Sequence, residues 1–105
     1  MTFKDREEAF ESKYKHDEDI RFRTIARRNK LLGFWIAEQL GLKGKDAEHY
    51  ARTVVQADLK MPGDQDVLDK IQADLNDAGV QLSEHRVQKR LEECFAEAKR
   101  EMMHE

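Results

Sequence analysis

The amino-acid sequence predicts an all-α protein, a four-helix bundle preceded by an N-terminal arm that is flexible or partly helical. Apolar residues recur at spacings of three and four in four successive segments, as they do on the buried side of helices. No segment alternates with the period of two that a half-buried strand requires. Glycine and proline at 41, 44, 62, 63 and 79 separate the segments, and such short connections favour neighbouring helices in a bundle.

Residues 1–18 are predicted to be a mobile arm, and residues 19–105 the bundle domain. Phe3, Phe10 and Tyr14 would fall on one narrow stripe of a helix, at ~100° per residue. Burial of three rings at roughly 1.5 to 3 kcal/mol each is small against ordering the segment at ~1 to 2 kcal/mol per residue. We therefore expect the arm to order only against a partner.

The first bundle helix is predicted to begin at the acidic cluster Asp17, Glu18 and Asp19, because carboxylates offset the positive end of the helix dipole. Asn29 lies on its otherwise apolar line, where it could be buried and fix register, or lie at the edge of the stripe; we favour the edge. Trp35 widens the stripe. The stripe itself consists of Phe22, Ile25, Ala26, Asn29, Leu32, Gly33, Ile36 and Leu40.

The three remaining helices are predicted from their caps and stripes. Asp46 can cap the second, Asp64 and Asp66 open the third, and Ser83 caps the fourth. The expected inward residues are Ala47, Tyr50, Ala51, Val54, Val55 and Leu59 in the second, Val67, Leu68, Ile71 and Leu75 in the third, and Val87, Leu91, Cys94, Phe95, Ala98 and Met102 in the fourth.

Charge is distributed unevenly along the chain. The net charge is -3, made up of -3 over residues 1–19, +6 over residues 20–45 and -6 over the remainder. An acidic balance argues against a general polyanion binder. The basic face could be solvated, could bind nucleic acid, or could dock an acidic surface or hold the acidic arm. This face consists of Arg21, Arg23, Arg27, Arg28 and Lys30.

No pattern typical of an enzyme or a metal site is found in the sequence. The single cysteine, Cys94, cannot form an internal disulfide and is expected in the core. The four histidines lack ligand spacing, and the glycines lack a phosphate-loop pattern. No run approaches the ~20 apolar residues of a membrane span, and the first residues do not resemble a targeting signal. We expect a cytoplasmic protein.

A set of short motifs extends over most of the chain. They are Asp5-Arg6-Glu7-Glu8-Ala9-Phe10-Glu11 with Lys13-Tyr14, His16-Asp17, Ala26-Arg27-Arg28-Asn29-Lys30-Leu31-Leu32-Gly33 with Trp35, Ala37-Glu38 and Leu40-Gly41, then Asp66-Val67-Leu68 and Ala96-Glu97-Ala98-Lys99. Together they resemble the zeta subunit family, the alphaproteobacterial inhibitors of the rotary F-type ATPase. The string from Ala26 to Gly33 is the most specific part, whereas the C-terminal half is generic helix.

The resemblance implies a four-helix bundle whose mobile arm inserts at a catalytic interface between the alpha and beta subunits and touches gamma. The inserted arm would block rotation in the hydrolytic direction. The free protein would be a monomer, associated in the cell with the membrane-bound ATP synthase but not inserted in the membrane, and no nucleic acid would be bound. The resemblance implies that no cofactor is required, and it leaves weak binding of an adenine nucleotide as an alternative. The arm residues that would contact the ATPase are Phe3, Lys4, Arg6, Glu7, Glu8, Phe10, Glu11, Lys13 and Tyr14.

A second hypothesis belongs to a different class of protein. A small nucleic-acid-binding or ribosome-associated helical protein could use the basic face from Arg21 to Lys30, and its binding would fall steeply with salt.

Overall fold

The fold is described by a computed structural model that covers the backbone of residues 3–60 and 63–103 and the side chains of residues 18–58 and 63–103. Within these ranges it contains four helices and no strand. They are α1 (Phe3–Gln39), α2 (Gly44–Lys60), α3 (Gln65–Asp77) and α4 (Glu84–Met103). The predicted all-α, four-helix fold is confirmed.

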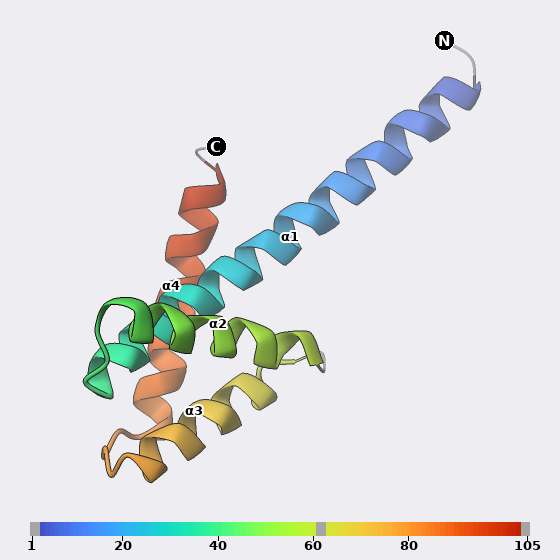
Figure 1. The fold of residues 1–105 in the computed structure, drawn as a ribbon. Helices are drawn as coiled ribbons and strands as arrows, with labels where there is room; N and C mark the ends of the chain where they lie inside the picture. The colour runs from blue at the N-terminus through green and yellow to red at the C-terminus, as the bar shows by residue number, and fades with distance from the viewer. Residues whose placement is uncertain (1–2, 61–62, 104–105) are drawn as a thin grey trace.

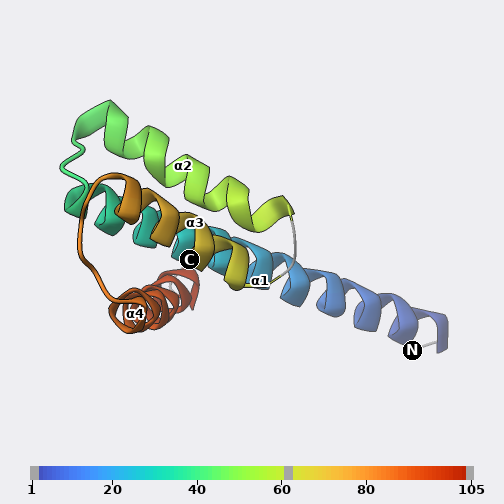
Figure 2. The ribbon, with the colours of Figure 1, turned by 90° about the horizontal axis from the view of Figure 1, so that it is seen from below.

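Helix α1 is the axis of the molecule (Figures 1 and 2). Its C-terminal half is flanked by α2 and α4, and α3 bridges α2 and α4. Its N-terminal half projects beyond the other three helices. A helix of 37 residues is about 55 Å long at 1.5 Å per residue, so α1 accounts for most of the 63 Å length of the molecule.

The predicted helix start at Asp17, Glu18 and Asp19 is wrong, because α1 runs through this cluster without a break. No proline and no glycine precede Gly33 in α1, and Glu, Lys and Arg are good helix formers. Asp19 instead pairs with Arg23 one turn later, at 3.3 Å between Oδ2 and Nε. Asp46 is likewise not a cap, since α2 begins at Gly44 and Asp46 lies in its first turn.

The core is built from all four helices, as the stripes predicted. Cys94 is among its residues, which confirms the expected core position. Trp35 packs at the edge of the core, with the Arg90 guanidinium 5.8 Å from its ring centre, and so joins α1 to α4. The central cluster consists of Leu32, Ile36, Val54, Val67, Ile71, Leu75, Val87, Leu91 and Cys94.

Three residues of the predicted stripes lie elsewhere than expected. Phe22 is 59% exposed and Phe95 is 39% exposed, so neither belongs to the core. Asn29 is 1% exposed, so the favoured edge position is wrong and the alternative, a buried asparagine, is correct. In α1 the core cluster begins at Leu32, after Phe22, and in α4 it ends at Cys94, before Phe95.

Helices α1 and α2 cross at Gly33. A Cβ placed on Gly33 would lie 2.7 Å from the Cα of Ala51 and 3.1 Å from its Cβ. Real Cβ atoms do not approach that closely, so only glycine allows α2 to lie this near α1. Ala51 is itself fully buried. The crossing therefore depends on two small residues facing each other.

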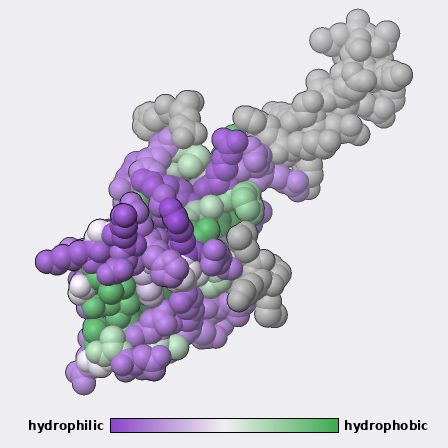
Figure 3. Space-filling view, viewed as in Figure 1, coloured by the Kyte–Doolittle hydropathy of each residue, from purple (hydrophilic) through white to green (hydrophobic). Residues whose placement is uncertain are grey.

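Two glycine helix ends and one N-cap follow the predicted chemistry. Gly41 and Gly79 have φ values of 78° and 70°, the left-handed geometry that ends helices. The amide of Arg86 donates to Oγ of Ser83 at 3.1 Å, which confirms the N-cap of α4. The surface drawn in Figure 3 is largely hydrophilic, with hydrophobic areas confined to separate patches.

Candidate protein-interaction site

The predicted arm residues from Phe3 to Tyr14 all belong to α1, in the part that projects beyond the bundle. Their side chains lie outside the described residues, so the aromatic stripe stays a prediction. For this segment the structure describes the course of the backbone. The backbone of the arm and that of the first helix of the bundle form one continuous helix, and the division into an arm and a bundle domain at residue 18 stays a prediction.

The predicted basic face is divided by the structure. Arg21, Arg23 and Lys30 are exposed. Arg27 and Arg28 are both used within the bundle, in ion pairs with α4 and with the residue that precedes α3. A docking role for the exposed three stays a prediction, whereas Arg28 does not lie on an exposed face.

Arg27 joins α1 to the last turns of α4. Its Nε donates to Oε2 of Glu101 at 2.6 Å, and its Nη2 donates to Oε1 at 3.3 Å. This hydrogen bond, with the attraction between the charges, raises the pKa of Arg27 and lowers the pKa of Glu101. Two-point guanidinium–carboxylate pairs fix orientation as well as distance.

Arg28 is 5% exposed and lies beside the start of α3. Its Nη2 lies 3.0 Å from Oδ1 of Asp64, and its Nε and Nη2 both donate to Oδ1 of Asn29, at 3.0 and 2.9 Å. Among the described residues, Nδ2 of Asn29 has no hydrogen-bond partner. The Arg28–Asp64 ion pair therefore joins the residue before α3 to α1. Its guanidinium is buried, whereas its carboxylate is 53% exposed.

Helix α4 diverges from α1 toward the C-terminus (Figure 1). Side chains of both helices line a groove between them. Its volume is about 350 Å³, and its lining is mostly apolar with two cations. We call it the α1/α4 groove. Its lining residues are Ile20, Arg21, Thr24, Phe95, Lys99, Met102 and Met103.

Sequence reasoning missed this groove. Ile20 and Met103 are apolar residues that belong to none of the predicted stripes, which is the one signal that could have drawn attention to them. The helical spacing predicts Phe95 in the core, whereas in the structure it lines the groove. The missing information was the relative placement of α1 and α4 at the end where they separate.

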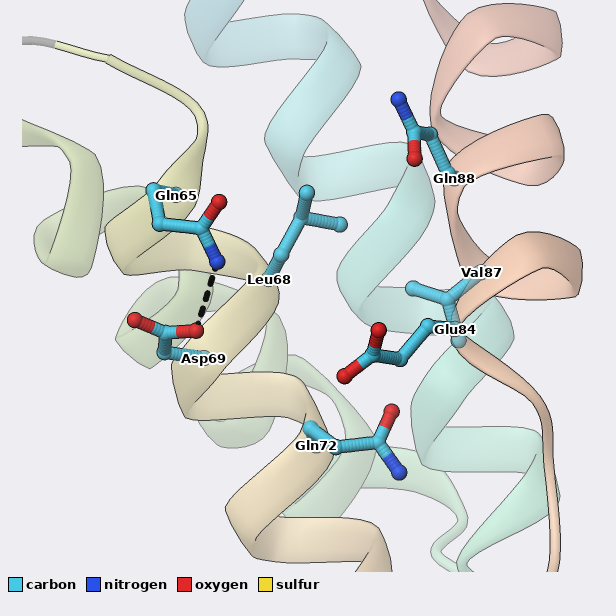
Figure 4. Close-up of a pocket in the computed structure, with 7 residues that line it drawn as sticks. All are labelled: Gln65, Leu68, Asp69, Gln72, Glu84, Val87 and Gln88. Carbon is cyan, nitrogen blue, oxygen red and sulfur yellow. Dashed lines mark hydrogen bonds between the residues drawn. The ribbon is translucent and has the colours of Figure 1, made fainter.

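A smaller pocket between α3 and α4 is polar (Figure 4). Its volume is about 90 Å³, Gln72 of α3 lies across from Glu84 of α4, and Nε2 of Gln65 donates to Oδ1 of Asp69 at 2.7 Å. Two carboxylates and no cation line it. Phosphate groups would be repelled here, so this pocket does not support the binding of an adenine nucleotide.

Helices α2 and α3 are joined by a third polar contact. The Tyr50 hydroxyl donates to Oδ2 of Asp74 at 2.8 Å, and Nζ of Lys70 donates to the same oxygen at 2.9 Å. Lys70 also lies 5.2 Å from the centre of the Tyr50 ring. Burial, followed by the bond to Asp74, raises the pKa of Tyr50, so the phenol stays protonated and donates at every ordinary pH.

These features, a helical fold with polar contacts between its helices and an apolar groove at one end, suit a protein that acts by binding another. The comparison with known families is decisive: the model of a family described as ATPase inhibitor subunit zeta matches residues 1–101. The chain belongs to this family. The family resemblance of the sequence motifs is thereby confirmed, and zeta family membership gives the chain a regulatory, inhibitory role toward the F-type ATPase.

The fold of this zeta family member is also similar to a protein structure determined by solution NMR. The two chains are 40% identical, with a TM-score of 0.72, over 80% of this chain and 95% of the other. A comparison with curated proteins finds no match.

The single cysteine lies in the core. Cys94 is fully buried, and desolvation raises the pKa of its thiol, which keeps it protonated and unreactive. Within the described part of the chain, no three potential metal-ligating side chains come together. No helix in that part has the length and apolar character needed to cross a membrane.

Proposed function

We propose that this zeta family member inhibits ATP hydrolysis by inserting residues 1–18, as an inhibitory arm, at a catalytic interface between the alpha and beta subunits, where it also touches gamma. Residues 19–105 act as the bundle domain that holds the arm in position. The single observation that supports this proposal best is the continuity of α1, which extends from the core past the bundle into the segment with the aromatic and acidic pattern.

The projecting part of α1 has no other helix of the bundle beside it (Figures 1 and 2). Phe3, Phe10 and Tyr14 would instead fill pockets of the partner, where a few buried aromatic side chains carry most of the binding free energy. The charged residues between them would set register and steer the encounter. The affinity should therefore be sensitive to the loss of any one of these rings.

The nucleic-acid alternative is not favoured by the geometry. Of the five cations of the predicted face, Arg27 and Arg28 are already paired with carboxylates, those of Glu101 and Asp64. Three exposed cations, on a chain of net charge -3, provide little electrostatic attraction for the phosphates of a nucleic acid.

The test is deletion of residues 1–15, followed by measurement of ATP hydrolysis by the purified F-type ATPase. We expect inhibition to be lost, while the truncated chain unfolds thermally as a cooperative unit like the full chain. Phe10→Ala should weaken inhibition about thirtyfold, the equivalent of ~2 kcal/mol for an anchoring side chain. Lys89→Ala, at an exposed position of α4, is the matched control. Full inhibition by the truncated chain would exclude the arm mechanism.

A further inference from the structure

We propose that the α1/α4 groove is a second docking site, and that it receives an amphipathic helix of the ATPase whose apolar side is flanked by carboxylates. This proposal rests on the proposed function, since it takes the ATPase as the partner. It assigns a distinct role to the bundle, which would contribute affinity of its own rather than only carry the arm.

The first support is the distribution of exposed apolar side chains. Four large hydrophobic residues remain exposed in the described part of the chain, and three of them line this groove: Ile20 (38%), Phe95 (39%) and Met103 (77%). The fourth, Phe22, does not line the groove, because two residues along a helix turn it about 200° away from Ile20. Scattered exposed apolar residues need no explanation, but a set gathered at one place indicates an interaction surface.

The second support is the form of the groove. It lies between two helices that diverge, and its cavity of about 350 Å³ is lined by side chains of both. A groove of this kind accepts the apolar side of a third helix, through anchors spaced at three and four residues. Met102 and Met103 contribute flexible, polarisable side chains that adapt to the surface they meet.

The third support is charge. Arg21 of α1 and Lys99 of α4 line the groove and are both exposed. Two neighbouring carboxylates are already engaged, Asp19 with Arg23 and Glu101 with Arg27. Among the side chains that the structure describes, neither Arg21 nor Lys99 has an ion-pair partner. Carboxylates flanking the apolar side of the incoming helix would complement these two cations.

Position and symmetry favour the ATPase over a second copy of this chain. The groove begins at Ile20, immediately after the arm on the same helix, so a partner that holds the arm meets the groove next. A two-fold dimer through this groove would instead bring the same patch of both copies together, with Arg21 and Lys99 of each copy near those of the other. Like charges that face each other across an interface oppose association.

The experiment measures binding of fluorescently labelled full-length chain to the purified catalytic sector of the ATPase, together with inhibition. Arg21→Glu with Lys99→Glu should weaken binding about tenfold, because attraction at two points becomes repulsion. Lys43→Glu with Lys89→Glu makes the same change of net charge at exposed positions outside the groove, and should weaken binding less than about threefold. At saturating concentration the groove variant should inhibit as fully as the wild type, since its arm is intact.

A second variant, Phe95→Glu, places a charge among the apolar residues of the groove and should weaken binding at least as much, with folding verified by thermal unfolding. The chain lacking residues 1–15 should still bind, more weakly, and should lose this residual binding when Arg21→Glu and Lys99→Glu are added. Unchanged affinity of the groove variants would overturn the proposal while leaving the arm mechanism intact. Sedimentation that shows a dimer of the wild type, abolished by Phe95→Glu, would also overturn it, in favour of a second copy. Inhibition by the truncated chain would contradict the arm mechanism alone.

Discussion

Arg27 of α1 and Glu101 of α4 form a two-point ion pair that joins the middle of the longest helix to the end of the last one. The pair lies next to the α1/α4 groove, since Met102, the residue after Glu101, lines it. It therefore limits how far the two helices separate. The sequence alone does not predict this ion pair, because its two residues are 74 positions apart.

The first prediction concerns the pH dependence of this pair. The hydrogen bond from Arg27 holds the pKa of Glu101 below its ordinary value of 4.5, so the folded state binds fewer protons there than the unfolded state. The contribution to stability is fully present above that ordinary value and is lost as pH falls through the lower pKa of the folded state. Glu101→Gln should therefore reduce the dependence of the urea midpoint on pH between about 6 and about 3.

Glu92→Gln is the control for this experiment, because Glu92 is an exposed carboxyl on the same helix. It should leave the pH profile of the wild type unchanged. Equal profiles for Glu101→Gln and the wild type would show that the ion pair does not contribute to stability in solution.

The second prediction concerns the helix crossing. Gly33→Ala would ordinarily stabilise a helix by about 1 kcal/mol, because alanine is the better helix former. Here the added methyl would lie 2.7 Å from the Cα of Ala51, so α2 must move away from α1. Overpacking of this kind costs typically about 1 to 3 kcal/mol, and we expect net destabilisation in chemical denaturation.

Lys30→Ala provides the comparison, as an exposed position of the same helix where the change should lie within about 0.5 kcal/mol. A more stable Gly33→Ala variant would mean that the two helices are farther apart in solution.

The third prediction concerns the buried guanidinium. Arg28→Met keeps much of the volume but leaves Oδ1 of Asn29 buried without its two donors. An unsatisfied buried acceptor costs about 1 to 3 kcal/mol, which should be measured as a lower free energy of unfolding. Arg28→Met with Asn29→Leu should recover a large part of that loss, since both polar partners are then replaced by apolar ones.

Arg23→Met, at an exposed arginine one turn earlier, should have little effect on the free energy of unfolding. If the double variant were no more stable than Arg28→Met alone, the loss would have to arise from the contact with Asp64 instead.

The stripes predicted the core well where α1 is surrounded, and failed where it is not. Phe22 and Asn29 are seven residues apart, so they point in nearly the same direction on the helix. One is 59% exposed and the other 1%. The start of α3 covers α1 at Asn29, as the contact between Arg28 and Asp64 shows, and no such cover reaches Phe22. Periodicity gives the direction of a side chain, but not how far along the helix its neighbours extend.

The candidate sites divide in a similar way. The arm was predicted from local residues and from the family resemblance, because its aromatic spacing lies within one helix. The groove and the pairs of Arg27 and Arg28 could not be predicted, because each joins segments that are distant in sequence. Their geometry depends on the angle at which α4 crosses α1, and no pattern within a single helix determines that angle.

The continuity of α1 also restricts how this family member can change by insertion and deletion. Along one unbroken helix, each residue added between the arm and the bundle turns the arm by about 100° and moves it outward by about 1.5 Å. An insertion of about seven residues nearly restores the direction of the arm, but moves it about 10 Å farther from the bundle. If the arm and the α1/α4 groove bind the same partner, as we propose, the length of α1 near residue 18 must match the distance between the two binding sites, whereas its side chains there need not be fixed.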